Sequence, residues 1–113
     1  MTMEYQAMTC RESIASLPGQ FSPVLAGKLK AEIQFRFTGD EPGTYFLHID
    51  EGICTFHEGE VPTPRITVSS PSEVWLAIVR KQISGSEAFL QGKLRVEGDF
   101  SLVLRLFQIF QLS

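Results

Sequence analysis

The hydrophobic period of this chain changes at Ala31, and that change constrains the fold more than any other feature of the sequence. In the stretch that follows, apolar residues alternate with polar ones, Ile33, Phe35 and Phe37 against Glu32, Gln34 and Arg36. A period of two places the two sets on opposite faces of a β-strand. The segment therefore predicts a strand with one face in the core and the other in water.

Further segments with the same alternation follow along the chain. A glycine-flanked loop at residues 39–43 and a tight turn at residues 50–52 separate the first of them, which predicts antiparallel hairpins. We expect a five-stranded, mostly antiparallel sheet with one polar face. The residues expected to point inward from the later strands are Tyr45, Leu47, Ile49, Cys54, Phe56, Ile66, Val68, Leu94 and Val96.

Capping signals mark the first two main helices. Thr9 and Glu12 have the spacing of a capping box, so a helix is expected to begin there. Ser70 is the expected N-cap of a later helix, with Pro71 in its first turn. Residues 74–79 are apolar almost all round, which predicts that this helix is buried on more than one side.

Two further helices are expected near the end of the sequence. Ser84 or Ser86 opens a short helix that ends at Gly92. Asp99 is expected to cap a last helix that runs through residue 112, with the apolar stripe Leu102, Val103, Leu106, Phe107 and Phe110. We expect Phe107 and Phe110 to line or close a cavity, Phe110 near a frayed end, and Val103 to anchor the helix to the sheet.

These elements predict one α/β domain of the α+β type over residues 1–113, with helices on one face of the sheet and residues 1–8 flexible. The chain has nine Phe beside one Trp and two Tyr, which is more apolar aromatic surface than a compact core needs. This surplus could line a cavity or simply pack, and the composition leaves both interpretations open.

Charge and composition exclude several classes of function. The net charge is −3 and the ten Lys and Arg are scattered, so we expect no nucleic-acid partner. The first residues show no leader pattern, and Cys10 and Cys54 are expected to stay reduced. The apolar stretch 100–112 would be about 20 Å long as a helix, too short to span a bilayer. We expect a cytoplasmic protein with at most transient membrane contact.

The candidate chemical residues are His48, Asp50, Cys54, His57 and Glu58. Cys54 and His57 have the spacing of half a zinc site, but residues three apart on a strand point to opposite faces. His48 and Asp50 share the polar face beside a turn, where solvated side chains are the ordinary interpretation. Nucleophile-elbow, phosphate-loop and dinucleotide-binding glycine motifs do not occur in the sequence. We therefore expect a binding protein and not an enzyme, with no catalytic residue, no metal and no cofactor.

Four short motifs occur in a distinctive order: Leu17-Pro18, Phe21-Ser22-Pro23, Ile66–Ser70 before a helix, and Ala88–Asp99. The last is a helix–Gly–strand–Gly–Asp passage. Together they resemble the sterol carrier protein type-two family of lipid-transfer domains, over about residues 14–110. The resemblance implies a lipid tunnel between the sheet and its helices, closed at one end by the C-terminal helix, and it brings no catalytic motif.

The ligand-contact positions that we infer with this resemblance are Phe35, Trp75, Ile78, Val79, Phe89, Leu90, Leu106, Phe107 and Phe110. Two departures from the family pattern lie in the region that the family uses around its cavity mouth. Pro64-Arg65 stands where members often carry an acidic residue, and residues 81–84 replace a Gly-Lys-Leu-type link. The ligand preference is therefore not carried over. Residues 111–113 do not form a peroxisomal address, which agrees with a cytoplasmic protein.

Three functions fit these observations. The first, which we expect, is a carrier that holds fatty acyl, acyl-CoA, sterol-like or isoprenoid ligands in an apolar tunnel. The second is an accessory or dimerisation module that presents a lipid to a partner enzyme without transferring it. The third is an interaction domain whose cavity is filled by its own side chains. The ligand class is thus a lipid or other apolar small molecule, while a homodimer and a partner enzyme stay open as protein partners.

Overall fold

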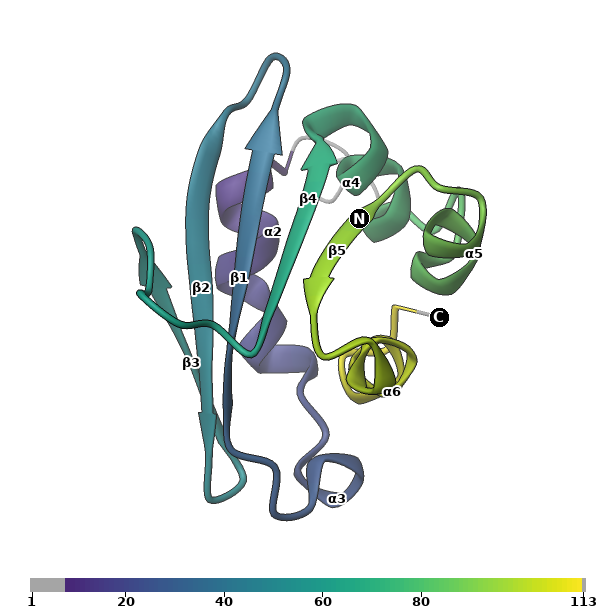
Figure 1. Ribbon diagram of the computed structural model, residues 1–113. Coiled ribbons are helices and arrows are strands. Elements are labelled where there is room, and N and C mark those ends of the chain that lie inside the picture. The colour runs from purple at the N-terminus through teal and green to yellow at the C-terminus, as the bar shows by residue number, and fades with distance from the viewer. Residues whose placement is uncertain (1–7, 113) are drawn as a thin grey trace.

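A five-stranded sheet forms one layer of the computed structural model, which describes residues 8–112 (Figure 1). Its strands are β1 (Ala31–Thr38), β2 (Gly43–Asp50), β3 (Ile53–Glu58), β4 (Ile66–Pro71) and β5 (Arg95–Gly98). They lie in the order β3-β2-β1-β4-β5, with β1 and β4 parallel and the other three pairs antiparallel. The expected α+β class and mostly antiparallel sheet are confirmed. The flexibility expected for residues 1–8 falls, except for Met8, outside the described range.

Short helices make up the second layer, over the apolar face of the sheet (Figure 1). They are α2 (Cys10–Ser16), η1 (Leu17–Gln20), α3 (Pro23–Ala26), α4 (Ser72–Val79), α5 (Gly85–Leu90), η2 (Phe100–Leu102) and α6 (Val103–Ile109). The capping box expected at α2 is present, since the Thr9 hydroxyl accepts from the Glu12 amide and the Glu12 carboxylate accepts from the Thr9 amide. Ser84 is the N-cap of α5, which decides between the two serines. None of the helices in residues 8–112 is long and apolar enough to cross a membrane.

The centre of the core lies where α2 and α4 meet the sheet. Trp75 of α4 is fully buried, and its indole Nε1 donates to the Ser13 hydroxyl of α2 at 2.7 Å. The Ser13 hydroxyl in turn donates to the Cys10 carbonyl at 2.7 Å. Because a buried polar group without a partner is costly, this pair of hydrogen bonds fixes how α4 lies against α2.

The helix after β4 begins later than the sequence predicts. Ser70 is not an N-cap: β4 runs through Pro71, and the Ser70 hydroxyl donates to the Pro71 carbonyl at 2.8 Å. The reason is the parallel ladder, which pairs Thr38 of β1 with Pro71 and keeps this end of β4 extended. Sheet pairing thus overrides a local capping signal.

The last helix is also shorter than predicted. Asp99 caps the 3₁₀ turn η2, not the helix itself, and α6 ends at Ile109. Gln111 then adopts a positive φ of 60° and the chain turns back. The Leu112 amide donates to the Phe107 carbonyl, and the Leu112 carbonyl accepts from Gly85 of α5. These two contacts use backbone groups that a continued helix would need for its own ladder.

The alternation in β1 predicts that Gln34 faces solvent, but the structure buries it. Its side chain is only 1% exposed, because the segment that crosses from β3 to β4 covers this part of the outer face. The Gln34 amide oxygen accepts from the Val61 amide of that segment at 2.8 Å. The amide side chain therefore fastens the crossover, which the parallel β1–β4 pairing requires.

Gly98 ends β5 at a point where the backbone of β4 comes very close. It has a φ of +110°, and a Cβ added there would lie 2.3 Å from the Arg65 carbonyl oxygen. We expect Gly98→Ala to lower the free energy of unfolding by about 3 kcal/mol, because it combines backbone strain with a backbone clash. Chemical denaturation measures this loss.

Gly19→Ala is the matched control for that substitution, because a Cβ at Gly19 meets no atom within 4 Å. We expect it to change the stability by less than about 0.5 kcal/mol. Equal effects of the two substitutions would contradict the close approach of β5 to Arg65.

Candidate functional site

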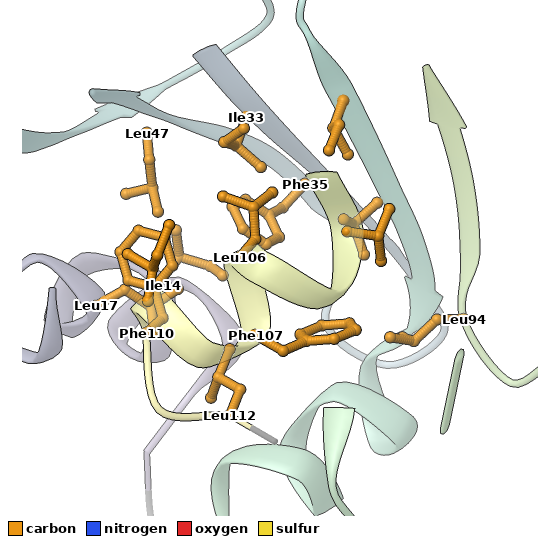
Figure 2. Packing of buried hydrophobic residues seen from close by; sticks show 14 of the residues in the cluster. Ile14, Leu17, Ile33, Phe35, Leu47, Leu94, Leu106, Phe107, Phe110 and Leu112 are labelled. Atoms are coloured by element: carbon orange, nitrogen blue, oxygen red, sulfur yellow. The ribbon is translucent and has the colours of Figure 1, made fainter. Parts of the chain in front are cut away.

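A small apolar cavity lies between the covered face of the sheet and α6 (Figure 2). Its volume, counted as the space open to the centre of a water-sized probe, is about 20 Å³. Every residue that lines it is apolar: Leu17, Ile33, Phe35, Ile66, Val68, Trp75, Val103, Leu106, Phe107, Phe110 and Leu112. A site of this composition can hold a hydrocarbon group but offers no polar partner to a headgroup.

The sheet wall of the cavity comes from the parallel strands β1 and β4. Their register places Ile33 beside Ile66 and Phe35 beside Val68. All four positions alternate toward the helices, so they form one continuous apolar patch. Because β1 and β4 are hydrogen-bonded in the middle of the sheet, this wall is rigid.

The opposite wall is one face of α6. Val103, Leu106, Phe107 and Phe110 follow the i, i+3, i+4, i+7 spacing of a single helical stripe. Figure 2 shows Leu106 pointing to the sheet, Phe107 lying toward Leu94, and Phe110 on the side of Leu17. Val103 therefore does not act only as an anchor, since it lines the cavity together with the two phenylalanines.

Aromatic rings close the cavity at α4 and at the end of α6. The Trp75 ring lies 5.5 Å from Phe35 and 5.8 Å from Phe37, measured between centroids. Phe110 lies 5.6 Å from Phe21 and is buried, so the expectation that it sits near a frayed end is wrong. Its burial comes from the turn at Gln111, which brings the end of the chain back over the core.

The predicted ligand-contact residues divide into three groups in the structure. Five of them line the cavity: Phe35, Trp75, Leu106, Phe107 and Phe110. Ile78 and Val79 are buried elsewhere in the core, and Phe89 packs half-buried against it. Leu90 is not brought to the cavity, because its side chain on α5 is 74% exposed. Contact with a ligand stays a prediction for the whole set.

Six lining residues were absent from the predicted set: Leu17, Ile33, Ile66, Val68, Val103 and Leu112. The alternation of β1 and β4 had already marked Ile33, Ile66 and Val68 as inward-facing, so the signal for them existed. Leu112 had no such signal, because it reaches the cavity only through the left-handed turn at Gln111.

Polar contacts hold the outer side of α6, in addition to the packing of its buried apolar residues. The Arg105 guanidinium donates to the Ala26 carbonyl of α3 at 2.8 Å and to the Leu25 carbonyl at 3.3 Å. The Ser22 amide donates to the Ile109 carbonyl at 3.0 Å. These bonds tie the α6 wall of the cavity to α3.

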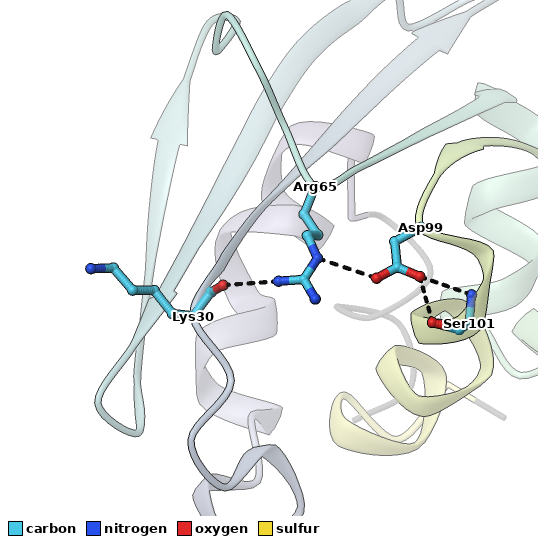
Figure 3. A network of polar contacts seen from close by, with 4 residues as sticks. All are labelled: Lys30, Arg65, Asp99 and Ser101. Carbon is cyan, nitrogen blue, oxygen red and sulfur yellow. Dashed lines mark hydrogen bonds and ion pairs between the residues drawn. The ribbon is translucent and has the colours of Figure 1, made fainter.

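A second polar group connects the start of β4 to the start of η2 (Figure 3). The Arg65 guanidinium donates to the Asp99 carboxylate at 3.2 Å and to the Lys30 carbonyl at 3.4 Å. The Asp99 carboxylate also accepts from the Ser101 hydroxyl and from the Ser101 amide. Hydrogen bonding from Ser101, and then from Arg65, lowers the pKa of Asp99. Arg65, at one of the two departures from the family pattern, thus ties the sheet to the turn that leads into α6.

The cysteines and histidines do not line the cavity. Burial raises the pKa of both Cys10 and Cys54 to about 12, so both thiols stay protonated near neutral pH and are poor nucleophiles. His57 contacts the Thr55 hydroxyl, and His48 contacts the Glu32 carboxylate. Among residues 8–112, no three His, Cys, Asp or Glu are grouped so that they could hold a metal ion.

The sequence is similar to a known protein family and to curated proteins. Residues 21–111 match the SCP-2 sterol transfer family. Among curated proteins, hydroxysteroid dehydrogenase-like protein 2 is similar in two organisms. The Danio rerio protein is 24% identical over 96 residues, or 84% of this chain and 23% of that protein. The Xenopus tropicalis protein is 31% identical over 77 residues, or 67% of this chain and 18% of that protein. The chain thus spans about a fifth of these relatives.

Solved structures share the fold. Palmitated SCP2L2 from Aedes aegypti has a TM-score of 0.72 at 24% identity, covering 91% of this chain and 95% of that one. The sec-alkylsulfatase Pisa1 from Pseudomonas sp. has a TM-score of 0.74 at 20% identity, covering 95% of this chain but 16% of the sulfatase. The family match covers most of the sequence, and the fold agrees with it. The chain therefore belongs to the SCP-2 sterol transfer family.

Proposed function

We propose that this lipid-binding domain holds the hydrocarbon chain of a lipid between the β1–β4 wall and α6. The observation that carries the proposal is the cavity lined only by apolar side chains, in a chain of the SCP-2 family. The palmitated relative from Aedes aegypti supports a fatty acyl chain as the first ligand to test. Acyl-CoA, sterol-like lipids and isoprenoids belong to the same class of apolar ligand.

The cavity must expand to accept such a ligand. A volume of about 20 Å³ is space for roughly one water-sized probe, far less than a long acyl chain needs. The sheet wall is fixed on both sides by strand pairing, whereas α6 has only seven residues. We therefore infer that α6 moves outward and that its bonds to α3 must break as it does.

The lipid headgroup belongs outside the cavity in this arrangement. The lining has no hydrogen-bonding side chain apart from the indole of Trp75, whose Nε1 is already bonded to Ser13. A charged or polar headgroup drawn inside would lose its hydration without compensation. A ligand with one long apolar part and a polar end fits this constraint.

A second function rests on the size of the relatives. The chain corresponds to 16% of the sulfatase and about a fifth of the hydroxysteroid dehydrogenase-like proteins, so related domains occur within larger proteins. An accessory domain that presents a lipid to a partner enzyme would need binding but no transfer activity of its own. Transfer of a fluorescent lipid between two vesicle populations by this chain alone distinguishes a carrier from such a module.

The direct test of binding is a titration with a fluorescent long-chain fatty acid. We expect saturable binding in the micromolar range, or roughly −8 kcal/mol. The emission of Trp75, the one Trp of the chain, should shift on binding because its ring lines the cavity. Absence of saturation, with the protein folded by circular dichroism, would contradict the proposal.

The role of α6 as the movable wall leads to a kinetic prediction. Arg105→Met removes the side-chain bonds from α6 to the carbonyls of Leu25 and Ala26. Loss of about 1 kcal/mol from the closed state should raise the rate of fatty-acid uptake about fivefold in stopped-flow fluorescence without vesicles.

Arg95→Met is the control for that experiment, since Arg95 is an exposed arginine on β5, away from α3. Its uptake rate should equal that of the parent. If Arg105→Met also takes up the ligand at the parental rate, the cavity does not open by separating α6 from α3.

A further inference from the structure

A polar groove lies on the outer face of the sheet, on the opposite side from the apolar cavity. It is lined by Lys30, Ala31, Glu32, His48, Thr63 and Arg65. Its volume, counted as for the apolar cavity, is about 300 Å³, against about 20 Å³ for that cavity. The two sites share no lining residue. Because the groove is open to solvent, a small molecule can enter it without any movement of the fold.

The floor of the groove is a pair of residues on neighbouring strands. Glu32 of β1 and His48 of β2 lie directly opposite each other in the antiparallel register, and both side chains alternate away from the core. The His48 Nδ1 lies 3.4 Å from the Glu32 carboxylate. Among the described residues that line the groove, Glu32 is the one acid, and this contact engages it.

One wall of the groove is the segment that crosses from β3 to β4, which contributes Thr63 and Arg65. The Arg65 amide donates to the Glu32 carbonyl at 2.9 Å. Earlier in the same segment, the Val61 amide donates to the Gln34 side chain at 2.8 Å. The segment is thus bonded to β1 on both sides of Thr63, so this wall is in place before a ligand binds.

Two cationic side chains stand beside each other at this wall (Figure 3). The Arg65 guanidinium uses Nε for Asp99 and Nη1 for the Lys30 carbonyl, and within residues 8–112 no hydrogen bond uses its Nη2. The Lys30 Nζ lies 4.0 Å from the Asp50 carboxylate, which is beyond hydrogen-bond distance. Both cations therefore keep donors for a ligand. Asp50 and Asp99 do not line the groove.

These donors favour an anion with several acceptor oxygens. A phosphate monoester carries three such oxygens, and a guanidinium, an ammonium and the Thr63 hydroxyl are three kinds of donor. Charge-assisted hydrogen bonds to phosphate are among the strong ones. A cationic ligand would instead meet Lys30 and Arg65 as like charges, and an apolar ligand would gain nothing from a charged lining.

We propose that this groove binds the phosphate monoester group of a small molecule, with Lys30, Arg65 and Thr63 as the donors. Asp50 and Asp99 stand behind the two cations and reduce their net charge, so the binding is weak. The groove and the apolar cavity lie on opposite sides of the sheet, and the proposal does not depend on the proposed function.

The test is a titration of the isotope-labelled protein with glycerol phosphate, followed through the backbone amide shifts by NMR. Sodium chloride keeps the ionic strength constant. We expect saturable shifts at Glu32, His48, Thr63 and Arg65, with a dissociation constant in roughly the millimolar range. Glycerol should leave these amides unshifted, because it lacks the phosphate.

Two substitutions test the cations. Lys30→Gln should weaken the binding about fivefold, because it removes one charge-assisted donor. The fold should tolerate it, since the Lys30 side chain is 74% exposed. Arg65→Gln should weaken the binding about tenfold or more, but it also removes the bond to Asp99. Circular dichroism therefore checks its fold, and Lys30→Gln decides by itself if Arg65→Gln does not fold.

Lys93→Gln is the matched control, because Lys93 is an exposed lysine before β5 and does not line the groove. It removes the same charge from the protein and should bind glycerol phosphate like the parent. Equal weakening by Lys93→Gln and Lys30→Gln would mean that the phosphate responds to the overall charge, and this result overturns the proposal. Unchanged binding by Lys30→Gln overturns it as well.

A second titration, with lysophosphatidic acid, identifies the source of the phosphate. Shifts of the groove amides with glycerol phosphate indicate a soluble ligand. Shifts with the lipid alone, weakened by Lys30→Gln, indicate a lipid headgroup. If neither compound shifts these amides, the proposal is wrong.

Fluorescent fatty acid, which has no phosphate, separates this proposal from the proposed function. Lys30→Gln should bind it like the parent, because Lys30 does not line the apolar cavity. A parent that binds glycerol phosphate but no fatty acid contradicts the proposed function alone. A parent that binds fatty acid but neither phosphate compound in the groove contradicts the groove proposal alone.

Discussion

The parallel pairing of β1 with β4 is the constraint on which the rest of the structure depends. It places Ile33 beside Ile66 and Phe35 beside Val68, which makes the rigid apolar wall of the cavity. It also requires the chain to cross the outer face of the sheet, from the β3 edge to the middle. The Gln34 side chain accepts a hydrogen bond from this crossing segment, at the Val61 amide. Because β4 leads directly into α4, the same pairing sets where Trp75 enters the core.

The two walls of the cavity differ in how firmly they are held. The sheet wall is bonded to neighbouring strands on both sides, and distortion there would break ladder hydrogen bonds. The α6 wall is a two-turn helix whose outer side is held to α3 by Arg105 and by the Ser22 amide. Under the proposed function, opening of the cavity would break the bonds from α6 to α3 and leave the sheet ladder intact.

The two histidines and the apolar cavity lie on opposite sides of the sheet. Burial keeps both thiols protonated, and the described histidines are engaged by a neighbouring hydroxyl or carboxylate on the outer side of the sheet. The apolar cavity lies on the other side, under the helices.

The sequence by itself determined which residues point inward, because a period of two or of 3.6 is a local property that each segment carries. This periodicity was enough to predict the inward-facing residues Ile33, Phe35 and Ile66 and the α6 stripe. Local sequence signals also predicted the capping box at Thr9 and the sheet of five strands. Tertiary structure alone decided that β4 lies parallel to β1, that Ser70 stays in the sheet, and that Gln34 is covered. It also decided that Leu90 faces solvent while Leu112 turns back to the cavity. These outcomes depend on contacts between segments far apart in the chain, and local periodicity holds no information about such pairings.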